Sequence, residues 1–312
     1  MLGTMPIENQ IDSYINTTHS SLAKRWVIFL DVSSLENNLC KQICLELETM
    51  GFPSIIIPID GDNTDDSYAF FEETRKYFQP DYILYPCRYL LQLENKIREQ
   101  ILSCHVPIIG YWYADTHNSD LSFISDLLRC APRFKSIITN QLGVSEKRDN
   151  VQYIGSSLSL LSMRQKYQSQ FLMGKDDILI LKAHNEMQQM LLEKLQTFFT
   201  IVEKNGQKEN IIHNAKMELI FHQNLIDEAC LQDIITSILQ KRIVLLPHHP
   251  LLEKYFSIGQ EVIAFNGQSE LFSAIYALQN NLQLNELIKR KAISRVINHY
   301  TINSAIRKIV ES

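Results

Sequence analysis

The sequence predicts an α/β protein with two doubly wound parallel sheets, and three observations lead to that class. Its 312 residues are about twice the length of an ordinary domain of roughly 150 residues. Hydrophobic residues make up 45% of the chain and charged residues 21%, as in packed globular proteins. Short runs that are apolar throughout alternate with amphipathic stretches of helical length. Such runs are typical of parallel strands that helices cover on both faces.

In the first half of the chain, this alternation continues from Trp26 to Ile154. Parallel strands joined by right-handed helical crossovers form a doubly wound domain. The expected strands are Trp26–Asp31, Ser54–Pro58, Tyr82–Tyr85, His105–Tyr113, Ser136–Thr139 and Val151–Ile154, and the expected helices are Asn38–Met50, Ser67–Tyr77, Leu91–Cys104 and Asp120–Arg129.

A second and shorter series of the same kind follows in the other half of the chain. Its expected strands are Asp177–Lys182, Lys216–Phe221, Ile243–Pro247 and Glu261–Phe265. Its expected helices are Glu186–Glu203, Asp227–Gln240, Ser269–Asn280, Leu284–Ile297 and Asn303–Val310. We therefore predict a polar N-terminal extension over residues 1–24, a first domain over 25–160, a Ser- and Gln-rich linker over 161–175, a second domain over 176–295 and a closing segment over 296–312.

The charge and the cysteines exclude some classes of protein. A net charge of −5, with no run of Lys and Arg, gives no footprint for nucleic acid. Six cysteines occur without a CxxC pair, which predicts free thiols rather than disulfides or a zinc site. The first 24 residues lack the pattern of a signal peptide, and no apolar stretch is long enough for a transmembrane segment. We therefore expect a cytoplasmic protein.

Glycine is scarce, at 10 residues, and neither GxGxxG nor GxxxxGK[ST] occurs. Loops that cradle phosphate with backbone N–H groups usually need glycine for close approach. A bound nucleotide would therefore be held mostly by helix N-termini and side chains.

The last third of the chain carries a specific order of elements: a strand ending in proline, a loop, an aromatic pair, a glycine, a strand and then helices. The features are Phe256, Gly259, Glu261, Glu270-Leu271, His299-Tyr300-Thr301 and Arg307. In this order they resemble the C-terminus of glycosyltransferases of the spore-maturation (CgeB-like) type. The segment from His213 to Phe221 is similar to the Asn-Ala-Lys strand that lines the donor site in that family.

The resemblance implies a GT-B-like fold, with two Rossmann-like domains facing across a cleft and a C-terminal helix that packs back on the N-terminal domain. It implies transfer of a sugar from a nucleotide-sugar donor, which is a substrate, to a hydroxyl group of a glycan, a protein or a small molecule. It implies no cofactor and no metal. The stereochemical outcome, inverting or retaining, stays open.

The sequence departs from the family pattern just before the Ile243–Pro247 strand. Thr236 stands where the family has the glutamate expected to hold the nucleotide ribose, and Asp233 stands where it has a cation. An alternative interpretation is therefore a catalytically inactive GT-B-like protein that acts as a binding or partner subunit.

The donor-side candidates carry the charges and hydrogen-bonding groups that a sugar diphosphate needs. A protonated His222 could contact phosphate, but it also fits a histidine at the end of a strand. Lys216 could pair with phosphate or be an ordinary strand-edge lysine. Glu228 could accept a sugar hydroxyl or complement the dipole of the helix that begins there. Thr236 and Glu261 join this set through the resemblance.

His248 and His249 directly follow a buried strand, where a ligand-contacting loop is expected. Adjacent residues of an extended segment point to opposite sides, which disfavours a metal site. Asp115, after Tyr111-Trp112-Tyr113, is the candidate catalytic base, since a carboxylate beside aromatic rings can have a raised pKa; it fits a helix cap equally well.

Overall fold

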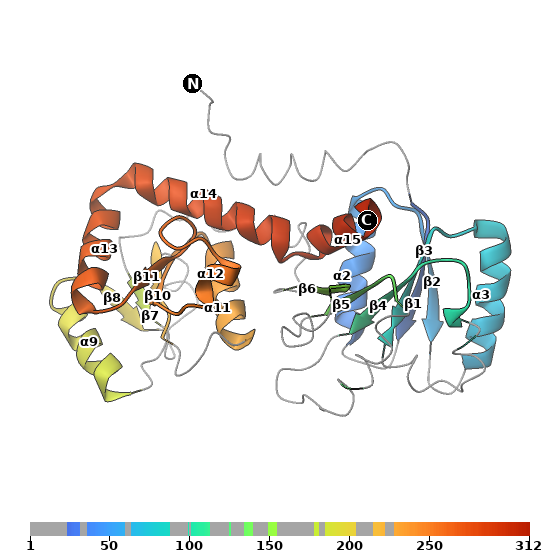
Figure 1. The fold of residues 1–312 in the computed structure, drawn as a ribbon, viewed down its shortest axis with the longest axis horizontal. Coiled ribbons are helices and arrows are strands. Elements are labelled where there is room, and N and C mark those ends of the chain that lie inside the picture. Colours follow the sequence, from blue (N-terminus) through green and yellow to red (C-terminus); the bar gives the residue numbers. More distant parts are fainter. Residues whose placement is uncertain are drawn as a thin grey trace, which may run out of the picture. The chain divides into compact units, whose positions relative to one another are not determined.

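The computed structural model describes residues 24–31, 36–59, 64–87, 99, 101–112, 125, 134–139, 149–154, 178–180, 185–203, 215–221 and 228–312. The chain divides into two compact units (Figure 1). The first comprises Met1–Ser162 with Tyr300–Ser312, and the second comprises Met163–His299.

The first unit is built on a six-stranded sheet in which every described pairing is parallel. The order of strands across the sheet is β2-β1-β3-β4-β5-β6. The strands are β1 (Trp26–Asp31), β2 (Ser54–Ile59), β3 (Tyr82–Pro86), β4 (Ile108–Trp112), β5 (Ser136–Thr139) and β6 (Val151–Tyr153).

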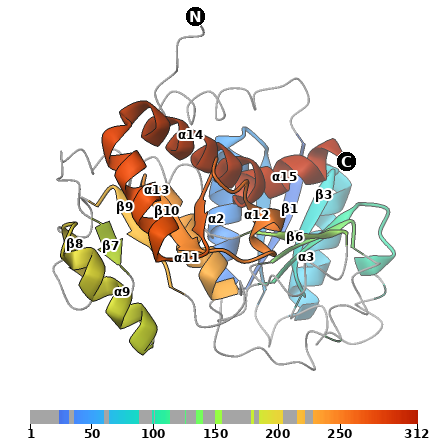
Figure 2. The ribbon, with the colours of Figure 1, turned by 60° about the vertical axis from the view of Figure 1, so that its left-hand side comes forward.

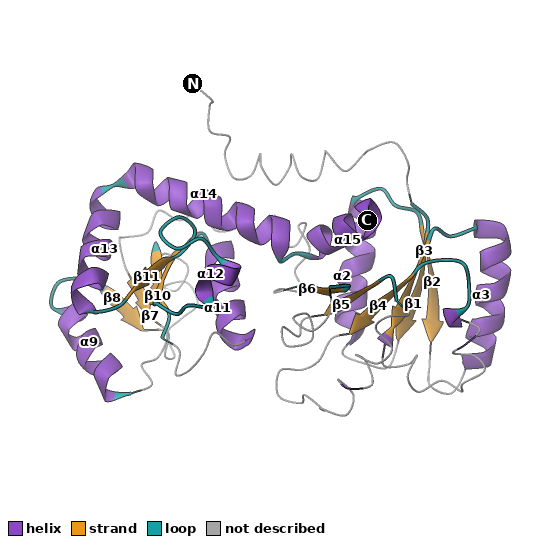
Figure 3. Ribbon diagram, in the orientation of Figure 1, coloured by secondary structure: helices purple, strands orange, loops and turns teal. Residues whose placement is uncertain are grey.

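Helices cover both faces of this sheet (Figure 3). Helix α3 (Thr64–Phe78) places Phe71 in the core on one face, where it contacts Phe29 of β1. Helix α2 (Glu36–Thr49) and helix α15 (Ile302–Glu311) share the core on the other face.

Helix α15 belongs to the first unit although it ends the chain. Thr301 caps its N-terminus, because its side chain accepts a hydrogen bond from the N–H of Ser304. Ile302, Ile306 and Ile309 are buried in the same core as residues of α2 and β1. The expected return of the C-terminal helix to the N-terminal domain is confirmed.

The second unit has a five-stranded parallel sheet in the order β11-β10-β9-β7-β8. Read from the other edge, the order is β8-β7-β9-β10-β11. When these strands are numbered 1 to 5 in chain order, this is 2-1-3-4-5, the order of the first five strands of the first sheet. Both units are therefore doubly wound. The strands are β7 (Ile178–Ile180), β8 (Ile201–Glu203), β9 (Met217–Leu219), β10 (Ile243–Pro247) and β11 (Ile263–Phe265). The predicted α/β class with two doubly wound parallel sheets is confirmed.

Five described helices surround this sheet (Figure 2). The leucines of α9 and α13 and Ile288 of α14 pack with the strands in one buried cluster. The helices are α9 (Glu186–Gln196), α11 (Glu228–Leu239), α12 (Leu252–Tyr255), α13 (Gln268–Asn280) and α14 (Leu282–His299).

One expected helix, Glu186–Glu203, is wrong at its end. Helix α9 ends at Gln196. Thr197 is its C-cap, and the backbone N–H of Thr197 donates to the carbonyls of Leu195 and Lys194. The β-branched residues Ile201 and Val202 then pair with β7 as strand β8. The short helix α12 was not expected. Of the predicted helix over 91–104, the structure describes residue 99 and residues 101–104, and these are helical as far as residue 102. Of the predicted helix over 120–129, it describes residue 125 alone.

The five cysteines that the structure describes are all free thiols: Cys40, Cys44, Cys87, Cys104 and Cys230. Within the described part of the chain, no helix is both long and apolar enough to cross a membrane.

Candidate functional site

The carboxyl ends of β9, β10 and β11 meet at one edge of the second sheet. Parallel pairing sets Leu219 beside Leu245 and Pro247 beside Phe265. His248 therefore follows β10 at the same edge where Gly267 follows β11. In doubly wound sheets, ligands bind outside the carboxyl ends of the strands. We refer to this as the carboxyl edge.

The histidine pair lies at the carboxyl edge, with its backbone fixed by the neighbouring strand. The N–H of His248 donates to the carbonyl of Phe265 at 2.8 Å, and the His248 side chain is exposed. Nδ1 of His249 accepts from the N–H of Leu251 at 3.2 Å. A nitrogen that accepts carries no hydrogen, so His249 can offer a donor to a ligand only through Nε2.

Helix α13 begins at the same edge with Gly267 as its N-cap. Gly267 is extended and contributes no capping side chain. The first helical bond is donated by Leu271 to the carbonyl of Gly267 at 3.1 Å. The N–H groups before it have no partner inside the helix, and they lie at the positive end of its dipole. This arrangement suits an anion.

Glu270 modifies that helix start. Its Oε2 accepts from the N–H of Asn266 at 2.7 Å and from Asn266 Nδ2 at 3.3 Å. The carboxylate therefore fixes the residue before the N-cap, whereas the acid of a capping box bonds the N–H of the N-cap itself. Glu270 also adds negative charge beside the N-terminal amides of α13.

The turn between α12 and β11, residues 256–262, is closed by its own backbone. Gly259 has φ of 77°, a left-handed conformation that favours glycine. Its N–H donates to the carbonyl of Val262 at 2.7 Å, and the N–H of Glu261 donates to the carbonyl of Ser257 at 2.9 Å. Phe256 anchors the turn, since its side chain is completely buried.

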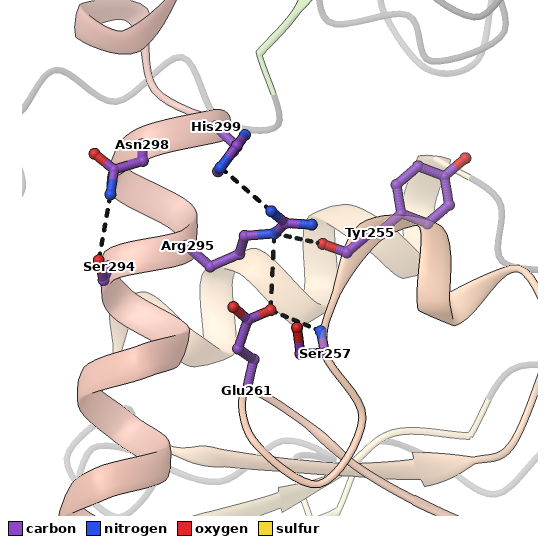
Figure 4. Close-up of polar contacts among 7 residues, drawn as sticks. All are labelled: Tyr255, Ser257, Glu261, Ser294, Arg295, Asn298 and His299. Atoms are coloured by element: carbon purple, nitrogen blue, oxygen red, sulfur yellow. Dashed lines mark hydrogen bonds and ion pairs between the residues drawn. The ribbon is translucent and has the colours of Figure 1, made fainter.

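Glu261 and Arg295 tie this turn to helix α14 (Figure 4). Oε2 of Glu261 accepts from the N–H of Ser257 at 2.7 Å and lies 3.7 Å from Nε of Arg295. Nε of Arg295 also donates to the carbonyl of Tyr255 at 2.8 Å. Both side chains are mostly buried, at 15% exposure for Glu261 and 26% for Arg295.

Arg295 also reaches one turn along its own helix. Its Nη1 lies 3.2 Å from Nε2 of His299. Arginine can only donate, so Nε2 of His299 is the acceptor and carries no proton in this arrangement. The structure thus brings Glu261 and His299, two residues of the C-terminal resemblance, to the same arginine.

Two of the predicted donor contacts lie away from the carboxyl edge. Lys216 precedes β9, and its carbonyl accepts from the N–H of Ile243 at 2.9 Å, so it stands at the amino end of the strands. Thr236 is exposed on α11, eight residues after Glu228, or about 12 Å along the helix axis. Neither residue is grouped with His248.

Three further candidates have no described side chain. His222 and Asp115 lie outside the described residues. Glu228 is the first residue of α11, and the structure describes its backbone alone. Their proposed roles stay predictions.

The sequence reasoning missed Arg295. Its signal was present, because Arg295 and His299 are four residues apart on a helix and so face the same side. Among the described residues, no group of three or more His, Cys, Asp or Glu side chains is placed to hold a metal ion.

No protein-family model and no curated protein sequence matches the chain. Among solved structures, the chain is similar to Anabaena HepE in complex with UDP-glucose, at 10% identity and a TM-score of 0.46 over 92% of this chain and 98% of that one. It is similar to a glycosyltransferase from Rickettsia africae, at 12% identity and 0.48 over 93% and 98%. It is also similar to an alpha1,3-fucosyltransferase, at 10% identity and 0.49 over 98% and 95%. The fold assignment rests on the two sheets described above.

Proposed function

We propose that this protein is a glycosyltransferase that moves a sugar from a nucleotide-sugar donor to a hydroxyl acceptor. The observation that carries the proposal is the closed turn of residues 256–262 and its attachment to α14. Four residues of the sequence resemblance take part in this arrangement. Phe256 is buried beneath the turn, and Gly259 has the left-handed conformation within it. Glu261 and His299 both contact Arg295 of α14.

The proposed donor site is the carboxyl edge of the second sheet. The N-terminus of α13 supplies backbone N–H groups and a positive dipole for the diphosphate of the leaving group. This stabilises the negative charge that develops on the leaving group, without a resident metal. In this proposal the exposed His248 donates a hydrogen bond to the diphosphate or to the nucleotide.

Glu261 and Arg295 act as positioning residues in this proposal. Their mutual contact and their bonds to Ser257 and Tyr255 hold the turn after α12 in one shape. That turn leads directly into β11, whose end carries the N-cap of α13. A loosened turn therefore changes donor binding without removing a ligand contact.

A thermal-shift series with UDP-, GDP- and CDP-linked sugars tests the proposal. A ligand that binds only the native state raises the melting temperature, by an amount that grows with its concentration relative to Kd. We expect one nucleotide class to stabilise the protein and His248→Ala to weaken that effect. His105→Ala, which removes an exposed histidine from the first unit, is the matched control. Absence of stabilisation by every donor at millimolar concentration contradicts the proposal.

A binding subunit without transfer activity is the second candidate. The placement of Thr236 and Lys216 favours it, since neither lies at the carboxyl edge. Hydrolysis of the bound donor, or transfer to an acceptor mixture, distinguishes the two: donor binding with no release of nucleoside diphosphate supports the binding subunit.

A further inference from the structure

Helix α3 of the first unit buries one side in the sheet core and leaves the opposite side exposed. Phe71 is completely buried, whereas its neighbour Phe70 is 49% exposed and Tyr77 is 83% exposed. Phe70 and Tyr77 are seven residues apart, so they lie on the same side of the helix, two turns from each other. Within the described part of the first unit, the large hydrophobic residues that are exposed are these two and Ile56 of β2.

Two opposite charges lie between the aromatic residues on this side of α3. Glu73 and Lys76 are both exposed, and neither forms a hydrogen bond or an ion pair with any residue that the structure describes. Glu72, on another side of the helix, is bonded to Arg75 at 2.7 Å and to the hydroxyl of Tyr68 at 3.2 Å. The unused anion and cation are therefore particular to the exposed side. We refer to Phe70, Glu73, Lys76 and Tyr77 as the outer face of α3.

The outer face is complementary to itself under a two-fold rotation. When two copies of α3 run antiparallel about an axis midway between Glu73 and Lys76, Glu73 of each copy lies opposite Lys76 of the other. The same rotation places Phe70 of each copy about 3 Å, along the helix axis, from the level of Tyr77 in the other. A two-fold axis repeats every contact, so both ion pairs form together. In a parallel pair, each charge would instead face its own copy and be repelled.

We propose that the outer face of α3 is a self-association site, to which a second copy of this chain binds through the same face. The aromatic residues supply the contact area, and the two Glu73–Lys76 pairs fix the antiparallel orientation. Helix α3 has 15 residues and is about 22 Å long. Two helices of this length bury less area than a standard interface of about 1,600 Å². The dimer is therefore weak and its population depends on protein concentration.

A solvated helix face is the competing explanation. Single exposed hydrophobic residues are common on monomeric proteins and need no partner. That explanation accounts for Phe70 and Tyr77, but it predicts that Glu73 and Lys76 have no effect on assembly. Changes of charge at these two positions therefore distinguish the two explanations.

Sedimentation velocity of the full chain, from micromolar to millimolar concentration, tests the aromatic part of the site. We expect a reversible dimer whose Kd rises about tenfold in Phe70→Ala and in Tyr77→Ala, as for central aromatic residues of other interfaces. Tyr276→Ala removes a tyrosine of α13 in the second unit that is 66% exposed, and it is the matched control. The control is expected to leave the Kd unchanged.

Exchange of the charges tests the antiparallel pairing. Glu73→Lys leaves two cations on each outer face and Lys76→Glu leaves two anions, so each single variant is expected to weaken the dimer. The double variant Glu73→Lys with Lys76→Glu restores both pairs in the opposite sense and is expected to recover most of the affinity. An equimolar mixture of the two single variants is expected to form a heterodimer that is tighter than either homodimer. Both positions are exposed, so we expect every variant to keep the melting temperature of the wild-type monomer.

Three results overturn the site. The first is a monomer at every concentration, and the second is a dimer whose Kd is the same in all these variants. The third is a double charge variant that is as weak as the single ones, because the two charges then do not face each other. A membrane surface is another occupant that exposed aromatic residues fit. Vesicles of phosphatidylcholine and phosphatidylglycerol that bind a monomeric wild type but not Tyr77→Ala would replace self-association by lipid binding.

Self-association is independent of the proposed glycosyltransfer. Helix α3 belongs to the first unit, and the proposed donor site belongs to the second. Tyr77→Ala is therefore expected to leave stabilisation by nucleotide sugars intact, and His248→Ala is expected to leave the dimer intact. Failure of either proposal can thus be recognised without the other.

Discussion

Arg242 and Glu218 form an ion pair in which both side chains are almost completely buried. Nη1 of Arg242 donates to Oε2 of Glu218 at 2.6 Å, with the side chains 1% and 3% exposed. Ser237 donates to the same oxygen at 2.7 Å from helix α11. The contact joins β9, α11 and the start of β10 inside the second unit.

Glu218→Gln should strongly destabilise the second unit. It leaves the Arg242 guanidinium buried without its counter-charge, and breaking one side of such a pair costs about 3 to 5 kcal/mol. Urea unfolding followed by hydrogen exchange within β9 and β10 measures the loss. Ser237→Ala, which removes one bond to the carboxylate, should cost about 1.5 to 3 kcal/mol.

The double variant Glu218→Leu with Arg242→Met is the control for this pair. Replacing both buried charges by apolar groups of similar volume is often neutral or stabilising. We expect it to recover most of the stability that Glu218→Gln loses. A double variant as unstable as the single one would show that shape, rather than charge, decides the site.

The pattern of apolar strands was predictable from the sequence, but this pair was not. The Ile243–Pro247 strand was predicted at its observed bounds, because a short apolar run next to a proline has few alternatives. Glu218 interrupts an apolar run without changing its period, and its partner is 24 residues away. Long-range pairing of charges leaves no local signal in a single sequence.

The candidate site was predictable in part. His248 was expected at the end of a strand and lies there. Lys216 was included because it could pair with phosphate and lies in the segment similar to the strand that lines the donor site. Residues that precede parallel strands lie at the amino end of the sheet, so the direction of the chain argued against it. Arg295 was missed because its role depends on a turn 40 residues earlier, which only the folded chain brings near.

Gly110→Ala should destabilise the first unit. Gly110 lies in the buried strand β4, where an added Cβ would be 2.6 Å from Sγ of Cys87 and 3.2 Å from side-chain atoms of Ile137 and Phe134. Overpacking of this kind costs about 1 to 3 kcal/mol. The fall in melting temperature measures it.

The compensating variant is Gly110→Ala with Cys87→Ala, which removes the sulfur that the new methyl group meets. We expect part of the stability to return, because the remaining contacts are longer. Equal melting temperatures for wild type and Gly110→Ala would contradict the packing described for β4.

Cys44 should react faster than Cys104 with iodoacetamide at pH 8. A hydrogen bond with Cys40 lowers the pKa of Cys44, whereas burial raises the pKa of Cys104. The thiolate is the nucleophile, so the lower pKa gives the larger reactive fraction at that pH. The difference should shrink as the pH rises and Cys104 ionises. Peptide mapping by mass spectrometry at several pH values measures both rates.

Two variants of Cys40 separate the hydrogen bond from access to the thiol. Cys40→Ala removes the bond and should slow Cys44, while Cys40→Ser keeps a hydroxyl donor and should preserve much of the rate. If both variants leave the rate unchanged, the reactivity of Cys44 reflects exposure alone.

Glu261→Ala should loosen the turn of residues 256–262. It removes the acceptor for the N–H of Ser257 and the counter-charge of Arg295. Loss of a side chain that caps backbone N–H groups costs about 1 kcal/mol. Hydrogen exchange at Ser257 should therefore accelerate. Arg295→Lys should act in the same direction, because an ammonium group lacks the planar fork that serves Glu261 and the Tyr255 carbonyl together. Arg290→Lys, on the same helix, is the control.

If the turn positions the donor site, Glu261→Ala also weakens stabilisation by the nucleotide sugar. Faster exchange with an unchanged donor effect would leave Glu261 a structural residue and remove the turn from the proposed mechanism.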